Sequence, residues 1–352
     1  MGKLAVYKYV AAMFLVIQII VCLFTFLGLF GGDVNPIGNS SRAMIVYILP
    51  LMIIANFLLL FYWLIRRRWF YALIPVITIA CCVPYIGTLL QFRSLNREAD
   101  TKEGLKIATY NVAMFGRETS GFKAVDILAE VRRQKVDVLC IQEYNDFSGD
   151  KKNSATYKEY FPYMQIGRED MVIFSRYPIK GHKTILFDDT NNSAMWADIE
   201  VNGQEIRVFN VHLQTTGISR TMHQAEKVRI QQDYDVSKSR LLSAIYGNYT
   251  LGMMFRASQA VIVANEKRSS EKPCIMCGDF NDVPYSFVYN TMLGNMVDGF
   301  KECGSGFMYT FRGAKAVRID YIFHDPSLKG LTYYRGELNN SDHYPVFMKI
   351  SL

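Results

Sequence analysis

Three long stretches without a charged residue constrain the fold of this chain more than any other feature. They cover residues 9–32, 43–65 and 69–92 and contain 24, 23 and 24 residues. A helix of about 20 residues crosses the hydrocarbon core of a bilayer. We therefore predict a membrane anchor in residues 1–92, with three transmembrane helices at about 9–32, 43–65 and 69–92. A mean hydropathy of +0.07 agrees, and a purely water-soluble chain is excluded.

The first stretch could also be a signal peptide, because Lys3 and Lys8 give it a basic start. Its uncharged run is longer than the apolar core of such peptides, which has about 7–15 residues, and two more runs follow. We therefore expect an uncleaved span. The second stretch contains Pro50 and Asn56, which a span tolerates where neighbouring helices satisfy the polar groups.

The composition changes after the third stretch. Residues 93–104 are polar and charged, and we interpret them as a linker of at most roughly 40 Å when extended. Beyond it, short apolar runs rich in Val, Ile and aromatic residues alternate with turn signals, which is typical of strands. Asn202-Gly203 predicts a two-residue hairpin turn. Residues 121–135 and 255–267 show helical spacing, whereas 218–254 is less regular and is interpreted as an insertion. An α/β or α+β domain is predicted over 105–352.

The seven cysteines suggest no disulfide framework, and Cys274 and Cys277 are expected to pack in the core because no further ligands complete a metal site. Three histidines fit no motif and are expected in loops or at the surface: His182, His223 and His324.

Polar side chains able to bind a cation or move a proton stand at the ends of the strand-length runs. Each has an ordinary explanation as a cap or turn residue. Together they form the oxygen-rich set that Mg²⁺ or Mn²⁺ prefers, with imidazoles left for proton transfer and phosphate contact. Asp320, inside an apolar run, is costly there unless it is paired, and His343 is its natural partner if the two strands are neighbours. The set comprises Asn111, Glu143, His212, Asp279, Asn281, Asp320, Asp342 and His343.

These residues lie in segments that resemble the ordered signatures of the endonuclease/exonuclease/phosphatase family. That family includes pancreatic-type deoxyribonucleases, abasic-site endonucleases, inositol-polyphosphate 5-phosphatases and neutral sphingomyelinases. The resemblance covers about 105–352 and implies a four-layer α/β (α+β) sandwich of two packed β-sheets flanked by helices, with the active site at one edge. The segments are TYN at 109–111, IQE at 141–143, SRYPI at 175–179, NVHL at 210–213, GDFND at 278–282, RIDYIF at 318–323 and SDHYPV at 341–346.

The resemblance also implies a role for each residue of the set. Glu143 is the principal metal ligand, with Asn111 and Asp342 near the same ion or a second one. Asp279 and Asn281 position the attacking water. His343, oriented by Asp320, contacts the scissile phosphate or transfers a proton, and His212 donates to a non-bridging phosphate oxygen. Either Asp279 or His343 could be the general base.

The sequence therefore predicts a membrane-anchored, divalent-metal-dependent phosphoesterase that hydrolyses a phosphodiester or phosphomonoester by attack of water. Its expected partners are a phosphate-ester substrate and the lipid bilayer, and the sequence indicates no particular protein partner. Residues 1–92 hold six Lys/Arg and one Asp, which leaves a near-neutral +2 for residues 93–352 and speaks against nucleic acid. The short linker favours lipid or another small phosphorylated molecule. Both substrate classes stay open.

Two further hypotheses complete the reading of the sequence. A catalytically inactive membrane-bound binding or scaffold protein on the same fold would lack Glu143, Asp279 or His343, and all three are present. Short loops rich in Lys/Arg stay inside the cell, and Arg66, Arg67 and Arg68 form such a loop. Three crossings then place the catalytic domain outside the cytoplasm, in the periplasm of a bacterium with two membranes.

Overall fold

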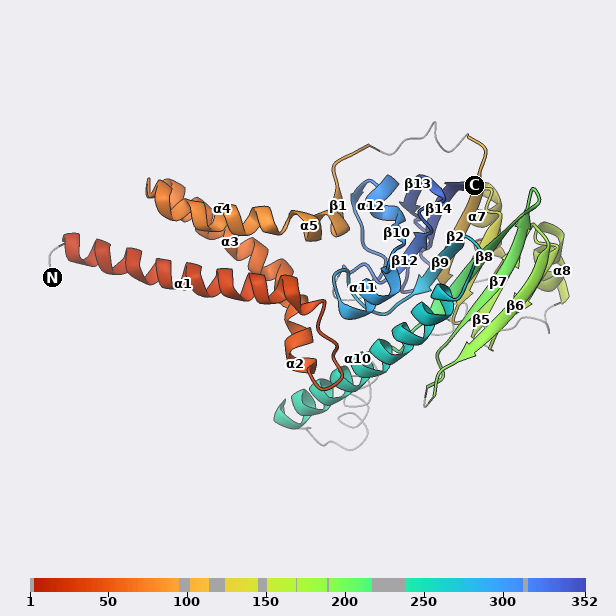
Figure 1. Cartoon of the computed structure of the whole chain (residues 1–352), viewed down its shortest axis with the longest axis horizontal. Coiled ribbons are helices and arrows are strands. Elements are labelled where there is room, and N and C mark those ends of the chain that lie inside the picture. Colours follow the sequence, from red (N-terminus) through yellow and green to blue (C-terminus); the bar gives the residue numbers. More distant parts are fainter. Residues whose placement is uncertain are drawn as a thin grey trace. The chain divides into compact units, whose positions relative to one another are not determined.

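The structure, a computed structural model, describes residues 3–94, 102–113, 124–144, 151–168, 170–188, 190–216, 238–312 and 316–352. The chain divides into two compact units (Figure 1). The first comprises Met1–Thr88 and Pro284–Asn290, and the second comprises Leu89–Val283 and Thr291–Leu352.

The N-terminal segment of the first unit is mostly helical. Two stretches, Val6–Gly31 and Ser40–Ile65, are long and apolar enough to cross a membrane, as the sequence predicts. The predicted third span is a pair of helices that meet at 50°, so it counts as one span only if the bent pair crosses together. The elements are α1 (Lys3–Gly31), α2 (Ser40–Ala43), the 3-10 helix η1 (Met44–Ile48), α3 (Leu49–Ile65), α4 (Trp69–Cys81) and α5 (Val83–Leu89).

Polar side chains inside these helices satisfy one another. Gln18 Nε2 donates to Asn56 Oδ1 at 3.1 Å, and Asn56 Nδ2 donates to Thr25 Oγ1 at 2.9 Å. These bonds join α1 to α3, which lie side by side (Figure 1). The expectation that neighbouring helices satisfy Asn56 is confirmed, and Pro50 lies in the first turn of α3, where its missing N–H costs no bond.

Two six-stranded mixed sheets form the second unit within its described residues. The first sheet has the order β13 (Lys329–Arg335), β14 (Val346–Ser351), β2 (Leu105–Asn111), β3 (Val138–Gln142), β5 (Met171–Ser175), β4 (Tyr163–Ile166). The second has the order β10 (Val297–Asp298), β12 (Asp320–His324), β9 (Cys274–Asp279), β8 (Gln204–His212), β7 (Ser193–Val201), β6 (Ile179–Leu186).

The main core lies between the two sheets. Ile107 and Cys140 of the first sheet pack in one cluster with Val208 and Cys277 of the second, which confirms a core role for Cys277. Successive side chains of a strand point to opposite faces. Because Met195 and Ala197 of β7 belong to this inner cluster, Trp196 points outward.

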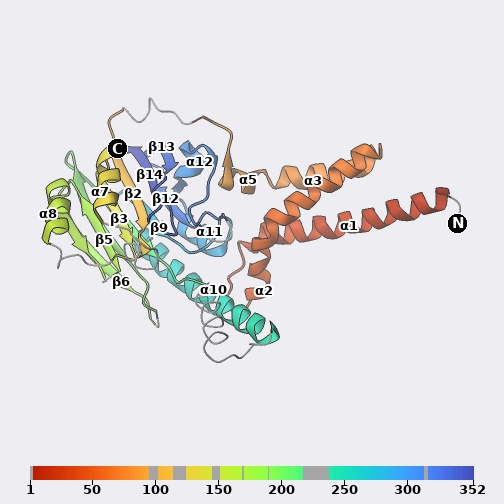
Figure 2. The same cartoon turned by 180° about the vertical axis from the view of Figure 1, so that it is seen from behind.

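Helices cover the outer face of each sheet, as seen from both sides of the unit (Figures 1 and 2). The helices α7 (Ala124–Arg133) and α8 (Lys151–Tyr160) pack on the first sheet, where Leu128 and Tyr157 join Phe174 in a second cluster. On the other side, the indole of Trp196 donates to Glu266 of α10 (Lys238–Arg268) at 3.0 Å. The predicted four-layer sandwich is therefore confirmed. Two short helices, α11 (Phe287–Leu293) and α12 (Gly299–Cys303), complete the described helices.

Local signals explain several elements, and others differ from the prediction. The β7–β8 turn holds Asn202 and Gly203 at φ 51° and 84°, as a two-residue turn with left-handed residues requires. The predicted helix at 255–267 begins much earlier, at Lys238, so the second half of the expected irregular insertion is helical. Residues 218–237 of that insertion lie outside the described residues.

The chain joins the second unit before the polar stretch at 93–104. Leu90–Gln91 form β1, which pairs with β11 (Gly306–Phe307), and Met308 N donates to Leu89 O at 3.0 Å. The third apolar stretch, expected to be helical to residue 92, therefore ends in a strand.

Candidate active site

The topology gathers the carboxyl ends of four strands at one edge of the sandwich. Each sheet contains one parallel pair, β2 with β3 and β8 with β9. Asn111 ends β2 and His212 ends β8, while Asp279 ends β9 and Glu143 follows β3. Parallel pairing places the carboxyl ends of neighbouring strands at the same edge within each sheet. The hydrogen bond between Asn111 and Asp279 joins these edges of the two sheets.

Two antiparallel strands bring the remaining groups to that edge. Asp320 is the first residue of β12 and pairs with Asp279, so it lies at a strand end rather than inside a strand as predicted. His343 precedes β14, whose first residue Val346 pairs with Thr109 of β2.

Asp279 is at the centre of the cluster. Its Oδ2 accepts from Asn111 Nδ2 at 3.0 Å and from Asn281 Nδ2 at 3.2 Å, and lies 3.6 Å from His343 Nε2. The same amide nitrogen of Asn111 donates to Glu143 Oε1 at 3.0 Å. The side chain of Asp279 is 1% exposed, and burial raises the pKa of this carboxyl above its usual range.

His343 links the two sheets. Its Nδ1 lies 3.0 Å from Asp320 Oδ2, which belongs to the other sheet. Burial alone would lower the pKa of His343, but the charges of Asp320 and Asp279 outweigh burial and raise the pKa to about 10. The ring is therefore an imidazolium at neutral pH in this arrangement, with each nitrogen facing a carboxylate.

His212 has a partner that the sequence did not reveal. Its Nδ1 lies 3.2 Å from Asp170 Oδ2, and its Nε2 lies 3.8 Å from Glu143 and 4.0 Å from Asp279. Burial opposes protonation, but the hydrogen bond to Asp170 and the charges of Asp279 and Glu143 raise the pKa of His212 above its ordinary value. Asp170 stands directly before β5, so the signal used for the other residues, an acid beside an apolar strand, also applies to it.

Asp342 has no direct hydrogen bond to the other seven predicted site residues within the described part of the chain. Its Oδ1 accepts from Ser341 Oγ at 3.3 Å. The same hydroxyl donates to the backbone carbonyl of Asn111 at 2.8 Å. Ser341 therefore links Asp342, which precedes His343 in the chain, to the strand end that carries Asn111.

Backbone conformation supports this arrangement at three positions. Glu143 and Asn281 have φ of 52° and 53°, the left-handed region that residues other than glycine seldom adopt. Gly278 has φ 139°, and a Cβ there would lie 1.9 Å from the carbonyl oxygen of Val211. Only glycine lets β8 and β9 approach closely enough to bring His212 and Asp279 together. Strain of this kind is tolerated where the surrounding structure enforces it, often at functional sites.

Beneath the site, buried amides tie the two sheets together. Gln142 Nε2 donates to Asn210 Oδ1 at 2.6 Å and to Thr109 Oγ1 at 3.0 Å. Asn210 in turn donates to the carbonyls of Ile141 and Val172. Gln142 and Asn210 lie within their strands, and nothing in the sequence indicates that they bond each other.

The charge of the site fits a bound cation. Four carboxylates, those of Glu143, Asp170, Asp279 and Asp320, face two imidazoles, and within the described residues they form ion pairs with these histidines alone. Negative charge therefore exceeds positive charge even when both rings are protonated. Such a surplus is costly unless a cation compensates it.

Two sets of side chains could take part in holding the cation. Ligand atoms of Asp279, Asp320 and His343 lie within 4.8 Å of one another. Both ring nitrogens of His343 already face carboxylates in this buried set, which leaves it no free ligand atom. Glu143 is 34% exposed and has oxygens open to solvent, so the donor set around Glu143 and Asn111 fits a hard divalent cation better.

The three histidines outside the motifs differ from one another. His182 lies on β6 with an exposed side chain, as expected. The expectation that His324 lies in a loop or at the surface is wrong. This residue ends β12 and is fully buried, and its Nε2 lies 2.7 Å from Glu302 Oε2. His223 lies outside the described residues.

Comparison with family models assigns both parts of the chain. Residues 108–343 match the model described as the Endonuclease/Exonuclease/phosphatase family, and residues 11–89 match a domain of unknown function. No curated protein matches the chain.

Solved structures share the fold of the second unit at low identity. A D. rerio TDP2 humanised by 14 mutations has a TM-score of 0.51 at 16% identity, over 70% of this chain and 99% of that chain. An endonuclease/exonuclease/phosphatase from Bacteroides vulgatus has a TM-score of 0.50 at 17% identity, over 71% and 100%. The human Nocturnin catalytic domain has a TM-score of 0.50 at 16% identity, over 70% and 93%.

Proposed function

The chain belongs to the endonuclease/exonuclease/phosphatase family of hydrolases that act on phosphoester bonds, and on that premise we propose that it is a membrane-anchored, divalent-metal-dependent phosphoesterase. The observation that carries the proposal is the position of Asp279, which touches Asn111 and Asn281 and faces His343 at the edge where both sheets end.

In the proposed reaction Asp279 accepts a proton from the attacking water while Asn281 orients it. His343, held by Asp320, is the imidazolium that contacts the scissile phosphate, and the arrangement of its two nitrogens supports this role over that of general base. His212, oriented by Asp170, donates to a non-bridging oxygen. Donors fixed before the reaction stabilise charge that develops in the transition state.

Glu143 and Asn111 would hold the cation, Mg²⁺ or Mn²⁺, with Asp342 beside them. The ion supplies positive charge against the phosphate oxygens. Asn111 presents its amide nitrogen to Glu143 and Asp279 and its Oδ1 to the backbone N–H of Ala113. Rotation of this amide would turn the oxygen toward a cation held by Glu143.

Removal of divalent cations is expected to abolish hydrolysis. The full chain in detergent, treated with EDTA, should lose activity on bis-p-nitrophenyl phosphate because the carboxylate surplus then has no counter-charge. Added Mg²⁺ or Mn²⁺ should restore it, and isothermal titration should report binding that Glu143→Gln weakens. Full activity in EDTA would overturn the metal dependence.

We further propose that the catalytic domain lies outside the cytoplasm, in the periplasm of a bacterium with two membranes. The two apolar helices and the Arg66–Arg67–Arg68 loop support the orientation, provided that α4 and α5 cross together as a third span.

Reporters fused after residue 104 test this orientation. Alkaline phosphatase is expected to be active there and green fluorescent protein dark, because the former needs an oxidising compartment and the latter does not fold when exported through the general pathway. The opposite pattern would mean two crossings and a cytoplasmic domain. Fusions after residue 36, between the first two spans, should match the outside pattern and serve as the control.

A further inference from the structure

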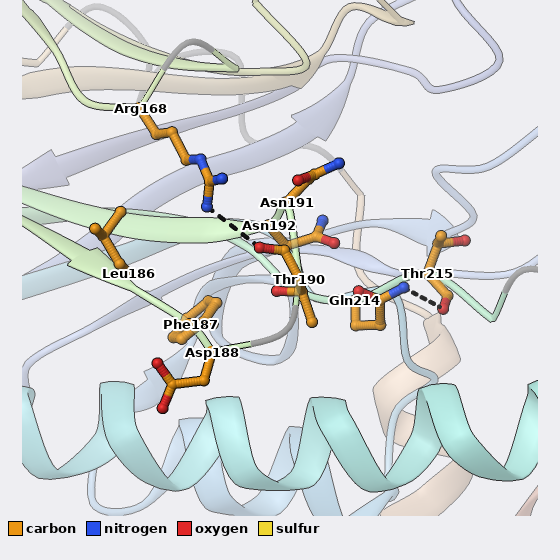
Figure 3. Close-up of a pocket in the computed structure, with 9 residues that line it drawn as sticks. All are labelled: Arg168, Leu186, Phe187, Asp188, Thr190, Asn191, Asn192, Gln214 and Thr215. Carbon is orange, nitrogen blue, oxygen red and sulfur yellow. Dashed lines mark hydrogen bonds between the residues drawn. The ribbon is translucent and has the colours of Figure 1, made fainter.

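Beside the catalytic edge, the second unit has a pocket of about 830 Å³ that the reaction proposed above does not use (Figure 3). It lies between the loop before β5, the β6–β7 connection and the segment after β8. Its polar lining consists of Arg168, Asp188, Thr190, Asn191, Asn192, Gln214 and Thr215.

The pocket and the catalytic edge share a wall. The carbonyl oxygen of Leu213 accepts from Asn192 Nδ2 at 3.2 Å on the pocket side and from Asn281 Nδ2 at 2.9 Å on the catalytic side. His212 and Gln214 are the neighbours of Leu213 in the chain, one in each site. Gln214 of the pocket lining therefore lies two residues along the chain from His212, the proposed phosphate contact.

The lining has the chemistry of a polyol site. Three amides and two hydroxyls offer both donors and acceptors, which is what neighbouring hydroxyl groups of a ligand require. Phe187, the aromatic residue of the lining, is 4% exposed, so it offers little face on which a base could stack. Arg168 is the one cation of the lining, whereas a nucleic-acid backbone draws on several.

Several of these polar groups have hydrogen-bonding capacity to spare. Arg168 donates through Nη1 to the carbonyl of Thr190 at 3.2 Å, a bond drawn in Figure 3, and this is the one hydrogen bond of its side chain to the described residues. Asn191 is exposed and has no hydrogen bond to any described residue. Gln259 of α10 holds two segments of the lining in place. Its Nε2 donates to Thr190 Oγ1, and its Oε1 accepts from the backbone N–H of Gln214.

We propose that this pocket binds the polyol part of the substrate, so that the enzyme acts on the phosphate ester of a sugar or an inositol. The inference rests on the proposed function and names its substrate class. Arg168 binds a hydroxyl or one further anionic group, and the amides of Asn191, Asn192 and Gln214 bind the remaining hydroxyls. Such a ligand exists both as a soluble phosphate and as a lipid headgroup, and the experiment separates the two.

The test compares substrates on the full chain in detergent with Mg²⁺. Inositol 1-phosphate and glucose 6-phosphate are the soluble polyol esters, phosphatidylcholine vesicles that contain phosphatidylinositol 4-phosphate are the lipid form, and p-nitrophenyl phosphate lacks a polyol. Arg168→Gln and Asn191→Ala are each expected to lower kcat/KM about tenfold more on the favoured polyol ester than on p-nitrophenyl phosphate, mainly through KM. Arg133→Gln, on the outer helix α7, is the matched control and should change neither.

The outcomes separate this inference from the function on which it rests. Equal losses on both substrates would mean that Arg168 acts on catalysis through Asp170, two residues away, and would overturn the polyol site. Hydrolysis of p-nitrophenyl phosphate without hydrolysis of any polyol ester would also overturn it and leave the phosphoesterase intact. Failure to hydrolyse any phosphoester would overturn both. Asn191 is exposed and has no hydrogen bond to another described residue, so Asn191→Ala tests the pocket with little effect on the fold.

Discussion

Replacement of Asp279 by Asn is expected to lower kcat by at least about 10²-fold. The change keeps the size of the side chain and removes the charge that faces His343 at 3.6 Å and accepts from Asn111 at 3.0 Å. Without it, the attacking water has no base and His343 loses one of its two carboxylate partners. Steady-state kinetics on bis-p-nitrophenyl phosphate with saturating Mg²⁺ measure the effect.

Glu143→Gln and His343→Ala should give losses of the same order, because they remove the ligand charge and the phosphate contact. Asp126→Asn, on the exposed side of α7, is the matched control and should behave like the unchanged protein. Activity retained in all three site variants, with circular dichroism unchanged, would contradict the proposed mechanism.

Replacement of Asp298 by Asn is expected to lower the free energy of unfolding by about 3–5 kcal/mol, because it leaves a buried guanidinium without its counter-charge. Asp298 and Arg318 form an ion pair whose side chains are 1% and 0% exposed. Arg318 also lies over the rings of Phe300 and Tyr321. Asp298 further caps α12 by accepting from the N–H of Phe300, a role that Asn can keep.

Urea unfolding of the full chain at fixed detergent concentration measures this loss. Glu159→Gln removes the partner of a solvent-exposed pair, 3.6 Å from Arg132, and is expected to cost less than about 1 kcal/mol. Similar stabilities for Asp298→Asn and Glu159→Gln would show that burial does not strengthen the Arg318 pair.

The site residues that could be predicted are those that a local sequence pattern marks. Asn111, His212 and Asp279 each close an apolar run, and the ends of neighbouring parallel strands lie at the same edge of a sheet. The contact between Asp320 and His343 could not be predicted from local pattern alone. The strands beside these two residues belong to different sheets, and the residues meet only at the edge of the sandwich.

What could not be predicted depends on partners far away in the sequence. His324 looks like a loop residue until β12 buries it beside Glu302, 22 residues earlier. The first half of α10 exposes Leu242, Tyr246 and Leu251, so these apolar residues do not mark a buried face of the helix. The bend between α4 and α5 likewise has no counterpart in hydropathy, which records only that both segments are apolar.

The pairing of β1 with β11 means that residues 92–104 are not a flexible tether between the helices and the catalytic domain. Because β1 and β2 belong to the same unit, residues 92–104 connect two strands of that unit. The length of this connection therefore does not set the distance between the enzyme and the membrane. Lengthening a closed loop adds only a small entropic term that grows with the logarithm of its length. Glycine and serine residues inserted there would therefore lengthen a connection within the second unit. The first connection between the two units lies earlier, between Thr88 and Leu89.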